Sequence, residues 1–130
     1  MATWAFYSDS ALGTAYSELS CTQTTSTFRV WFGSTSTGRK LIAQSTGATI
    51  YVIPADSATG GHSTSAIKIA ASTGALAATT GGASFALGTS VLGGAVNGEE
   101  FYVRVTDAVG NGIKSTELSL ALTACYETAT

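Results

Sequence analysis

The sequence predicts an all-β protein, an antiparallel sandwich or barrel of eight or nine short strands. Short segments in which apolar and polar residues alternate recur along the chain, and clusters of Gly, Ser and Asn separate them. β-branched residues are dense, whereas no long run of apolar residues has the spacing of an amphipathic helix. A chain of 130 residues can bury one core of its own, so we expect a single domain over residues 1–130.

Most strand candidates lie in the first two thirds of the chain. Phe28–Phe32 alternates and ends at Gly33, and the apolar run Thr49–Ile53 is stopped by Pro54. The remaining candidates are Trp4–Tyr7, Tyr16–Cys21, Leu41–Gln44, Ala66–Ala70 and Ser84–Leu87. We expect Trp31 to pack in the core, because apolar residues flank it in its strand.

The last two strand candidates have the clearest pattern, because every second residue in Phe101–Thr106 and in Glu117–Leu122 is apolar. Between them, the turn residues of Asp107–Gly112 include an Asn-Gly pair, which tolerates the positive φ angles of a hairpin. We therefore expect two antiparallel neighbours. Their apolar side chains should face the core: Phe101, Val103, Val105, Leu118, Leu120 and Leu122.

A Gly/Ala/Ser/Thr-rich excursion at residues 71–99 departs from the regular strand spacing. It contains several glycines, and apolar residues are spread between them. Loops of this length are uncommon unless they have a role or internal structure. We expect the excursion to wrap over one edge of the sandwich, in its own subunit or in a neighbour, because exposed strand edges invite unwanted pairing.

Charge and sequence motifs argue against several functional classes. Six basic residues and a net charge of −2 cannot form the basic stripe that nucleic acid requires, and no run of eighteen apolar residues predicts a membrane helix. His62, the only histidine, lies in a Gly/Ser turn, so no nucleophile and base pair is indicated. The turn at Asp107 has Val109 and Leu118 where a calcium loop needs oxygen ligands. We expect no enzyme activity and no catalytic, cofactor or metal site.

Two cysteines, Cys21 and Cys125, lie near opposite ends of the chain and have no CxxC spacing. Three interpretations stay open: two buried apolar side chains, a disulfide that ties the terminal strands together, or a reactive or metal-binding thiol. First and last strands often pair in sandwiches, so we expect the two cysteines to lie close together. The N-terminus lacks a basic region followed by an apolar stretch, which predicts cytosolic synthesis and no obligatory disulfide.

Several segments resemble known protein modules. The run Glu100–Thr123 combines a strand of the form FYVRV, an Asp-led Gly/Asn turn and a Leu-alternating strand, and it resembles the last two strands of immunoglobulin-like and fibronectin type III-like modules. The spacing from Cys21 to Trp31 is similar to that of the immunoglobulin B-strand cysteine and C-strand tryptophan, although Arg104 stands where the second cysteine would be.

The order of segments also resembles small virion proteins of tailed bacteriophages, which are immunoglobulin-like β-sandwiches that decorate or cement capsids or sit on tails. The resemblance covers about residues 28–123. The segments that carry it are Val30–Gly33, Ile67–Ala71, Ala86–Thr89 with Gly93 and Gly94, and Phe101–Asp107. It implies no catalytic residues.

This resemblance implies a non-enzymatic virion structural protein, foremost a capsid decoration or cement protein made in the host cytoplasm. Such a protein would bind in many copies to major capsid or other virion subunits, as a homo-oligomer or on the particle lattice. The alternative is an adhesion or carbohydrate-binding β-sandwich on a fibre or cell surface. The aromatic side chains that could stack on sugars in that case are Trp4, Phe6, Tyr7, Tyr16 and Trp31.

For the interface itself, we expect contacts from the apolar N-terminal segment and from Ile69–Gly98, a stretch of 30 residues without charge. Burying uncharged apolar surface between subunits is favourable, and few charges have to be desolvated. The candidate interface residues are Trp4, Phe6, Tyr7, Phe85, Val91 and Leu92.

Overall fold

A computed structural model of the chain describes residues 4–16, 25–56, 66–106 and 118–130. These residues form ten strands, one short α-helix and one 3-10 turn, and every strand pair is antiparallel. The predicted all-β, antiparallel class is confirmed. The strand number exceeds the expected eight or nine because two short strands, β7 (Ser90–Leu92) and β10 (Cys125–Ala129), carry no clear sequence pattern. In the described part of the chain, no helix has the length and hydrophobicity needed to cross a membrane.

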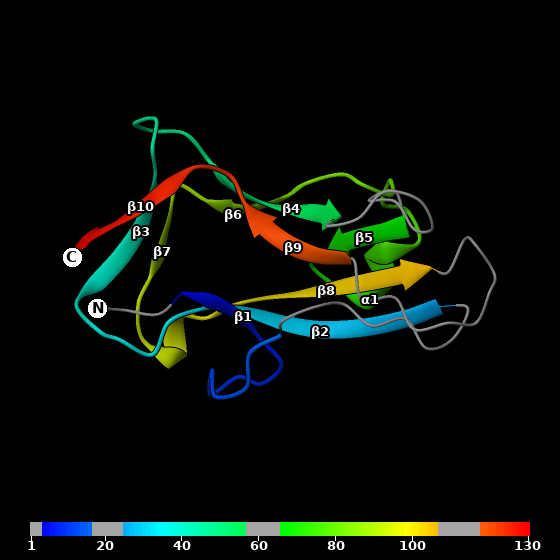
Figure 1. Cartoon of the computed structure of the whole chain (residues 1–130), viewed down its shortest axis with the longest axis horizontal. Coiled ribbons are helices and arrows are strands. Elements are labelled where there is room, and N and C mark those ends of the chain that lie inside the picture. Colours follow the sequence, from blue (N-terminus) through cyan, green and yellow to red (C-terminus); the bar gives the residue numbers. More distant parts are fainter. Residues whose placement is uncertain (1–3, 17–24, 57–65, 107–117) are drawn as a thin grey trace.

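Four strands form the first sheet, in the order β1-β2-β8-β5 (Figure 1). Their bounds are Ala5–Tyr7 for β1, Thr25–Gly33 for β2, Glu99–Thr106 for β8 and Ile67–Ala70 for β5. Side chains alternate along β2, so Val30 and Phe32 are buried whereas Trp31 lies on the opposite, outer face. The expected core position of Trp31 is therefore wrong.

Two three-stranded sheets, β10-β3-β7 and β6-β4-β9, complete the fold. The further bounds are Arg39–Ala43 for β3, Ile50–Asp56 for β4, Phe85–Gly88 for β6 and Leu118–Leu122 for β9. The strands form three consecutive pairs, β3 with β4, β6 with β7 and β9 with β10, and each pair has one member in each sheet. In both sheets the pair β3 and β4 supplies the middle strand, and the other two pairs supply the edge strands. Three chain segments thus run through both sheets, opposite the four-stranded sheet (Figure 1).

The core lies between the inner faces of all three sheets. Phe101, Val103 and Val105 are fully buried, as their alternation predicts. Leu120 and Leu122 are partly buried and pack against the same core, and the side chain of Leu118 lies outside the described residues. The buried cluster comprises Val30, Phe32, Leu41, Ala43, Ile50, Val52, Ala66, Ile67, Ile69, Leu87, Val91, Phe101, Val103 and Val105.

The expected hairpin between the two C-terminal strands is wrong. β8 pairs with β2 and β5, whereas β9 pairs with β4 in a different sheet. Each strand has one apolar face, and the two faces reach the core from different sheets. Alternation fixes which face of a strand is buried, but it does not fix which strand lies beside it. The predicted turn at Asp107–Gly112 lies outside the described residues.

Pro54 lies within β4 instead of ending it. Tyr51 accepts a hydrogen bond from the Thr123 amide at 3.0 Å, so its backbone groups point towards β9. Alternation then points the Pro54 nitrogen away from β9, towards the side where β6 pairs only as far as Val52. The proline therefore costs no ladder hydrogen bond at this position, and the strand continues.

Residues 71–99, which were expected to wrap over one edge of the sandwich, instead contribute regular structure to the sheets. Ser72 caps the helix α1 (Thr73–Leu76) by accepting a hydrogen bond from the Ala75 amide, and Leu76 is fully buried. β6 pairs with β4 and β7 pairs with β3, and each occupies one edge of its sheet. The 3-10 turn η2 (Ala95–Asn97) then leads into β8. Leu76, Leu87 and Val91 of this segment are buried in the fold of their own chain, whereas Leu92 and Val96 are exposed.

Cys125 begins β10, opposite Ala43 of β3, and partial burial raises the pKa of its thiol. β10 pairs with β3, and β1 pairs with β2. Residues 17–21 of the candidate strand that carries Cys21 lie outside the described residues. Cys21 and His62 lie outside the described residues. The proximity of the two cysteines therefore stays a prediction.

Candidate functional site

The N-terminal candidates for an interface pack onto the core of their own chain. The ring centroid of Phe6 lies 5.0 Å from that of Phe32, and the ring of Trp4 stacks on Phe32 at 6.2 Å. Tyr7 is only 8% exposed. These side chains pack against residues of their own chain. The prediction that they form a contact surface for another subunit is therefore corrected.

The three candidates from the uncharged stretch differ in their exposure. Val91 is 1% exposed and belongs to the core, and Phe85 packs against Phe101 at a centroid distance of 5.4 Å. Leu92 is 46% exposed, because alternation along β7 turns it outward next to the inward Val91. Among the six candidates, Leu92 is the one large apolar side chain that the fold leaves in solvent.

Leu92 belongs to a larger apolar surface on the outer side of the sheet β10-β3-β7. Ile42 lies opposite Tyr126 on one side and Ser90 on the other, and Leu92 lies opposite Lys40. Tyr126 is 50% exposed and Ile42 is partly exposed. We call this surface the apolar face: Lys40, Ile42, Ser90, Leu92 and Tyr126. The sequence did not predict Tyr126 as a site residue, because β10 has no recognisable alternation.

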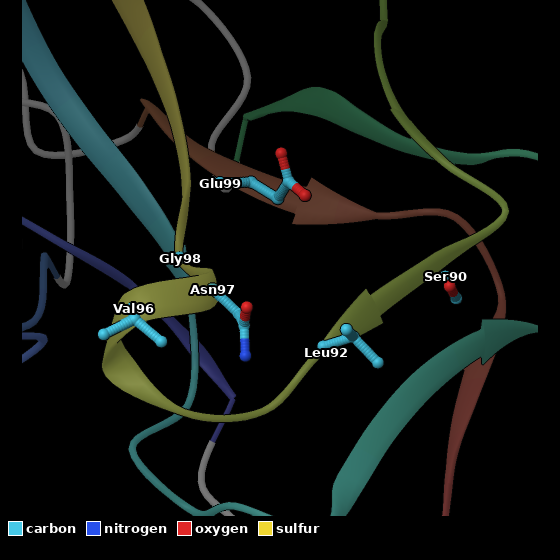
Figure 2. A pocket seen from close by; sticks show the side chains of 6 residues that line it. All are labelled: Ser90, Leu92, Val96, Asn97, Gly98 and Glu99. Atoms are coloured by element: carbon cyan, nitrogen blue, oxygen red, sulfur yellow. The ribbon is translucent and has the colours of Figure 1, made fainter. Parts of the chain in front are cut away.

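Two hollows adjoin the apolar face. Figure 2 shows the first, a pocket of about 350 Å³ between β7, η2 and the start of β8. Leu92 and Asn97 line it, and Val96, which is 96% exposed, points outward from the η2 turn. The second hollow, of about 330 Å³, lies beside Tyr126. Because Ser90 lines both, the hollows and the apolar face form one continuous surface.

Glu99 is the titratable group that lines the first pocket, and burial raises the pKa of its carboxyl. A lone carboxyl supplies an acid or a base, but general acid–base catalysis of hydrolysis needs a second positioned group. The described residues contain no group of three or more His, Cys, Asp and Glu side chains arranged to hold a metal ion. Leu92 and Val96 are the exposed large apolar side chains that line this pocket.

A hydrogen-bonded clasp holds β10, the strand that carries Tyr126 of the apolar face. The Trp4 indole donates to Glu127 Oε1 at 2.7 Å, and the Arg39 guanidinium donates to Glu127 Oε2 at 3.2 and 3.0 Å through Nε and Nη2. The clasp therefore joins the N-terminal segment, β3 and β10. Both donors favour the carboxylate, the indole most, and they lower the pKa of Glu127 below its ordinary value.

The clasp predicts an acid-dependent loss of stability. A lowered folded-state pKa means that Glu127 stabilises the fold above its ordinary pKa of 4.5, and that this contribution disappears as the pH falls through the folded-state value. We expect Glu127→Gln to melt below the wild type at about pH 7, and the difference to shrink below about pH 4.5. Thermal melts of both proteins over this range check it. A difference that does not change with pH would contradict the ionic role.

No protein-family model, curated protein or solved structure matches the chain. One further surface differs in character from the apolar face: Trp31, on the outer side of the four-stranded sheet, lies beside charged side chains. The guanidinium carbon of Arg29 is 4.7 Å from the centroid of the Trp31 ring.

Proposed function

We propose that this protein is a non-enzymatic structural component of a virus particle, a decoration or cement protein that binds in many copies to the capsid. Its partner is the major capsid protein or another virion subunit. The observation that carries the proposal is the apolar face, on which Leu92 and Tyr126 are about half exposed, with Val96 almost fully exposed beside it.

The composition of the apolar face suits a contact with another protein. The cores of protein interfaces are enriched in tyrosine and depleted of charged residues, and Lys40 is the one charged member of this face. Contiguous apolar surface is uncommon on soluble monomers unless it contacts a partner. The adjoining hollows would accept side chains that project from a neighbouring subunit.

We further propose an immunoglobulin-like topology for the sandwich. An immunoglobulin domain has one sheet with the strand order A-B-E-D and a second sheet that contains C and F as neighbours. The order β1-β2-β8-β5 supports this assignment if β8 takes the place of E. β3 and β4 then take the place of strand C, and β9 and β10 beside them take the place of strand F. β6 and β7 add one more strand on the other side of C.

A charge on the apolar face should weaken attachment without unfolding the protein. We expect Leu92→Glu to reduce binding to capsids by about tenfold or more, because a carboxylate would lose its water in the interface. The melting temperature should change little, because Leu92 is 46% exposed in the free protein. Co-sedimentation with capsids assembled from the major capsid protein of the same genome measures the binding, and thermal melts measure the fold.

The matched control is Ala11→Glu, which adds the same charge at an exposed position outside the apolar face. It should leave attachment unchanged. Wild-type protein that does not sediment with capsids would overturn the proposal, as would a gene that lies in a metabolic locus instead of beside capsid, portal or tail genes. Equal loss of binding in both variants would remove the apolar face from it.

A further inference from the structure

The outer face of the four-stranded sheet gathers three of the six basic residues of the chain. Lys68 of β5 lies directly opposite Arg104 of β8. Arg29 of β2 lies opposite Tyr102, two residues from Arg104 along the same strand. Neighbouring strands are about 4.8 Å apart, so the three cations occupy adjacent positions on one surface. We call this surface the basic face: Arg29, Trp31, Lys68, Tyr102 and Arg104.

Only one of these cations has an acidic partner among the described residues. Arg29 forms an ion pair with Glu100 at 2.6 Å, whereas no described carboxylate pairs with Lys68 or Arg104. The Nε atom of Arg104 is buried and has no hydrogen-bond acceptor in the described part of the chain. Like charges directly opposite each other on neighbouring strands destabilise a sheet, and an unsatisfied buried donor adds to the cost. An anionic ligand would offset the repulsion.

Two aromatic rings shape the same surface. The guanidinium carbon of Arg29 lies 4.7 Å from the ring centroid of Trp31 and 5.9 Å from that of Tyr102. These contacts and the ion pair with Glu100 fix the position of the guanidinium. Both rings are partly exposed, and the exposed Thr27 lies opposite Arg104. The face thus combines the positive charge of Lys68 and Arg104 with aromatic surface and a hydroxyl group.

We propose that the basic face binds an acidic saccharide, a sugar chain that carries uronic acid carboxylates. A carboxylate would pair with Lys68 and Arg104, which have no described acidic partner. Sugar hydroxyls match the threonine, and the C–H groups of a sugar ring pack on the face of an aromatic ring. Three cations are too few to follow the phosphates of a nucleic acid. An acidic peptide would supply the charge, but not the hydroxyl-rich ring that this combination of groups favours. This inference does not depend on the proposed virion function.

The test titrates the isotope-labelled full chain with oligogalacturonate and follows its spectrum by NMR. We expect shifts at the Trp31 indole and in the amides of β2, β5 and β8, and weaker binding at higher salt. Uncharged dextran, poly-glutamate, dextran sulfate and oligothymidylate serve as comparison ligands, because none of them carries a uronic acid. No shift with oligogalacturonate would overturn the proposal. Equal or tighter binding of poly-glutamate, dextran sulfate or oligothymidylate would overturn the uronic acid assignment and leave a surface for polyanions in general.

Two variants separate a binding role from a structural one. Lys68→Gln should weaken binding of oligogalacturonate by about tenfold or more while raising the melting temperature, because it removes the like-charge contact with Arg104. Lys40→Gln, which neutralises a cation on the apolar face, should leave binding unchanged. A lower melting temperature with unchanged affinity in Lys68→Gln would show that the lysine serves the fold and would contradict the proposal. Equal weakening by both variants would contradict it as well.

Discussion

Replacing Phe101 by alanine is expected to lower the free energy of unfolding by about 3–5 kcal/mol, the usual cost of removing a buried phenylalanine. Phe101 is fully buried in β8, a central strand of its sheet. Its ring contacts Phe6 and Phe85 at centroid distances of 6.2 and 5.4 Å. The substitution would therefore leave a cavity where the N-terminal strand, β6 and β8 meet, and the close packing of the surrounding core limits its collapse.

Urea denaturation of the wild type and Phe101→Ala measures this loss. The control is Tyr51→Ala, which removes an aromatic ring that is 38% exposed and should cost far less. A folded domain is commonly stable by about 5–15 kcal/mol, so Phe101→Ala leaves a small margin or none. Similar denaturation midpoints for Phe101→Ala and the wild type would show that the core is not centred on this residue.

The sequence predicts the half-buried strands of this fold well and the remaining strands poorly. β2 and β8 show clear period-two alternation, because one face of each strand is buried and the other is in solvent. Both strands are also long enough for the period to be recognised in the sequence. β7 has three residues, too few to show a period. β10 has Glu127 on the side where an apolar residue would complete the pattern, and its carboxylate is covered by hydrogen bonds from Trp4 and Arg39. Because Glu127 is covered by residues that are distant in sequence, the segment shows no apolar alternation that would predict a strand.

The exposure of individual side chains is a second feature that the sequence predicts poorly. Trp31 stands in an apolar run, and the run itself does not reveal which residues point inward. In the structure, Val30 lies opposite Phe101 on the buried face. Its neighbour Trp31 therefore points outward. Exposure of Leu92 likewise depends on the pairing of β7 with β3. Residue type indicates which side chains could form a contact, but the pairing of distant strands decides which of them reach the surface.

The two proposed surfaces lie on different sheets of the fold. The apolar face belongs to the sheet β10-β3-β7, and the basic face belongs to the sheet β1-β2-β8-β5. These sheets bury their inner faces in one shared core, so their outer faces point away from it (Figure 1). Attachment through Leu92 would therefore leave the cations of the basic face accessible. A protein bound to a particle in this way could display a saccharide-binding surface.

Gly93→Ala is expected to destabilise the fold by about 3 kcal/mol, the upper end of the range for overpacked sites. Gly93 is buried directly after β7, and its amide donates to the Arg39 carbonyl at 2.7 Å. A Cβ atom there would overlap the Ser36 carbonyl oxygen and lie 2.9 Å from that of Arg39. Both obstacles are backbone atoms, so the chain at the start of β3 would have to move away from β7.

The matched control is Gly74→Ala in α1, where an added Cβ atom meets nothing within 4 Å. This variant should be neutral or more stable by about 0.4–1 kcal/mol, because alanine restricts the unfolded chain and favours a helix. Urea denaturation compares the two alanine variants with the wild type. Equal midpoints for the two would show that the close approach of β3 and β7 adapts without cost. Because Leu92 adjoins Gly93, the same backbone shift should also disturb the apolar face and weaken capsid attachment in Gly93→Ala alone.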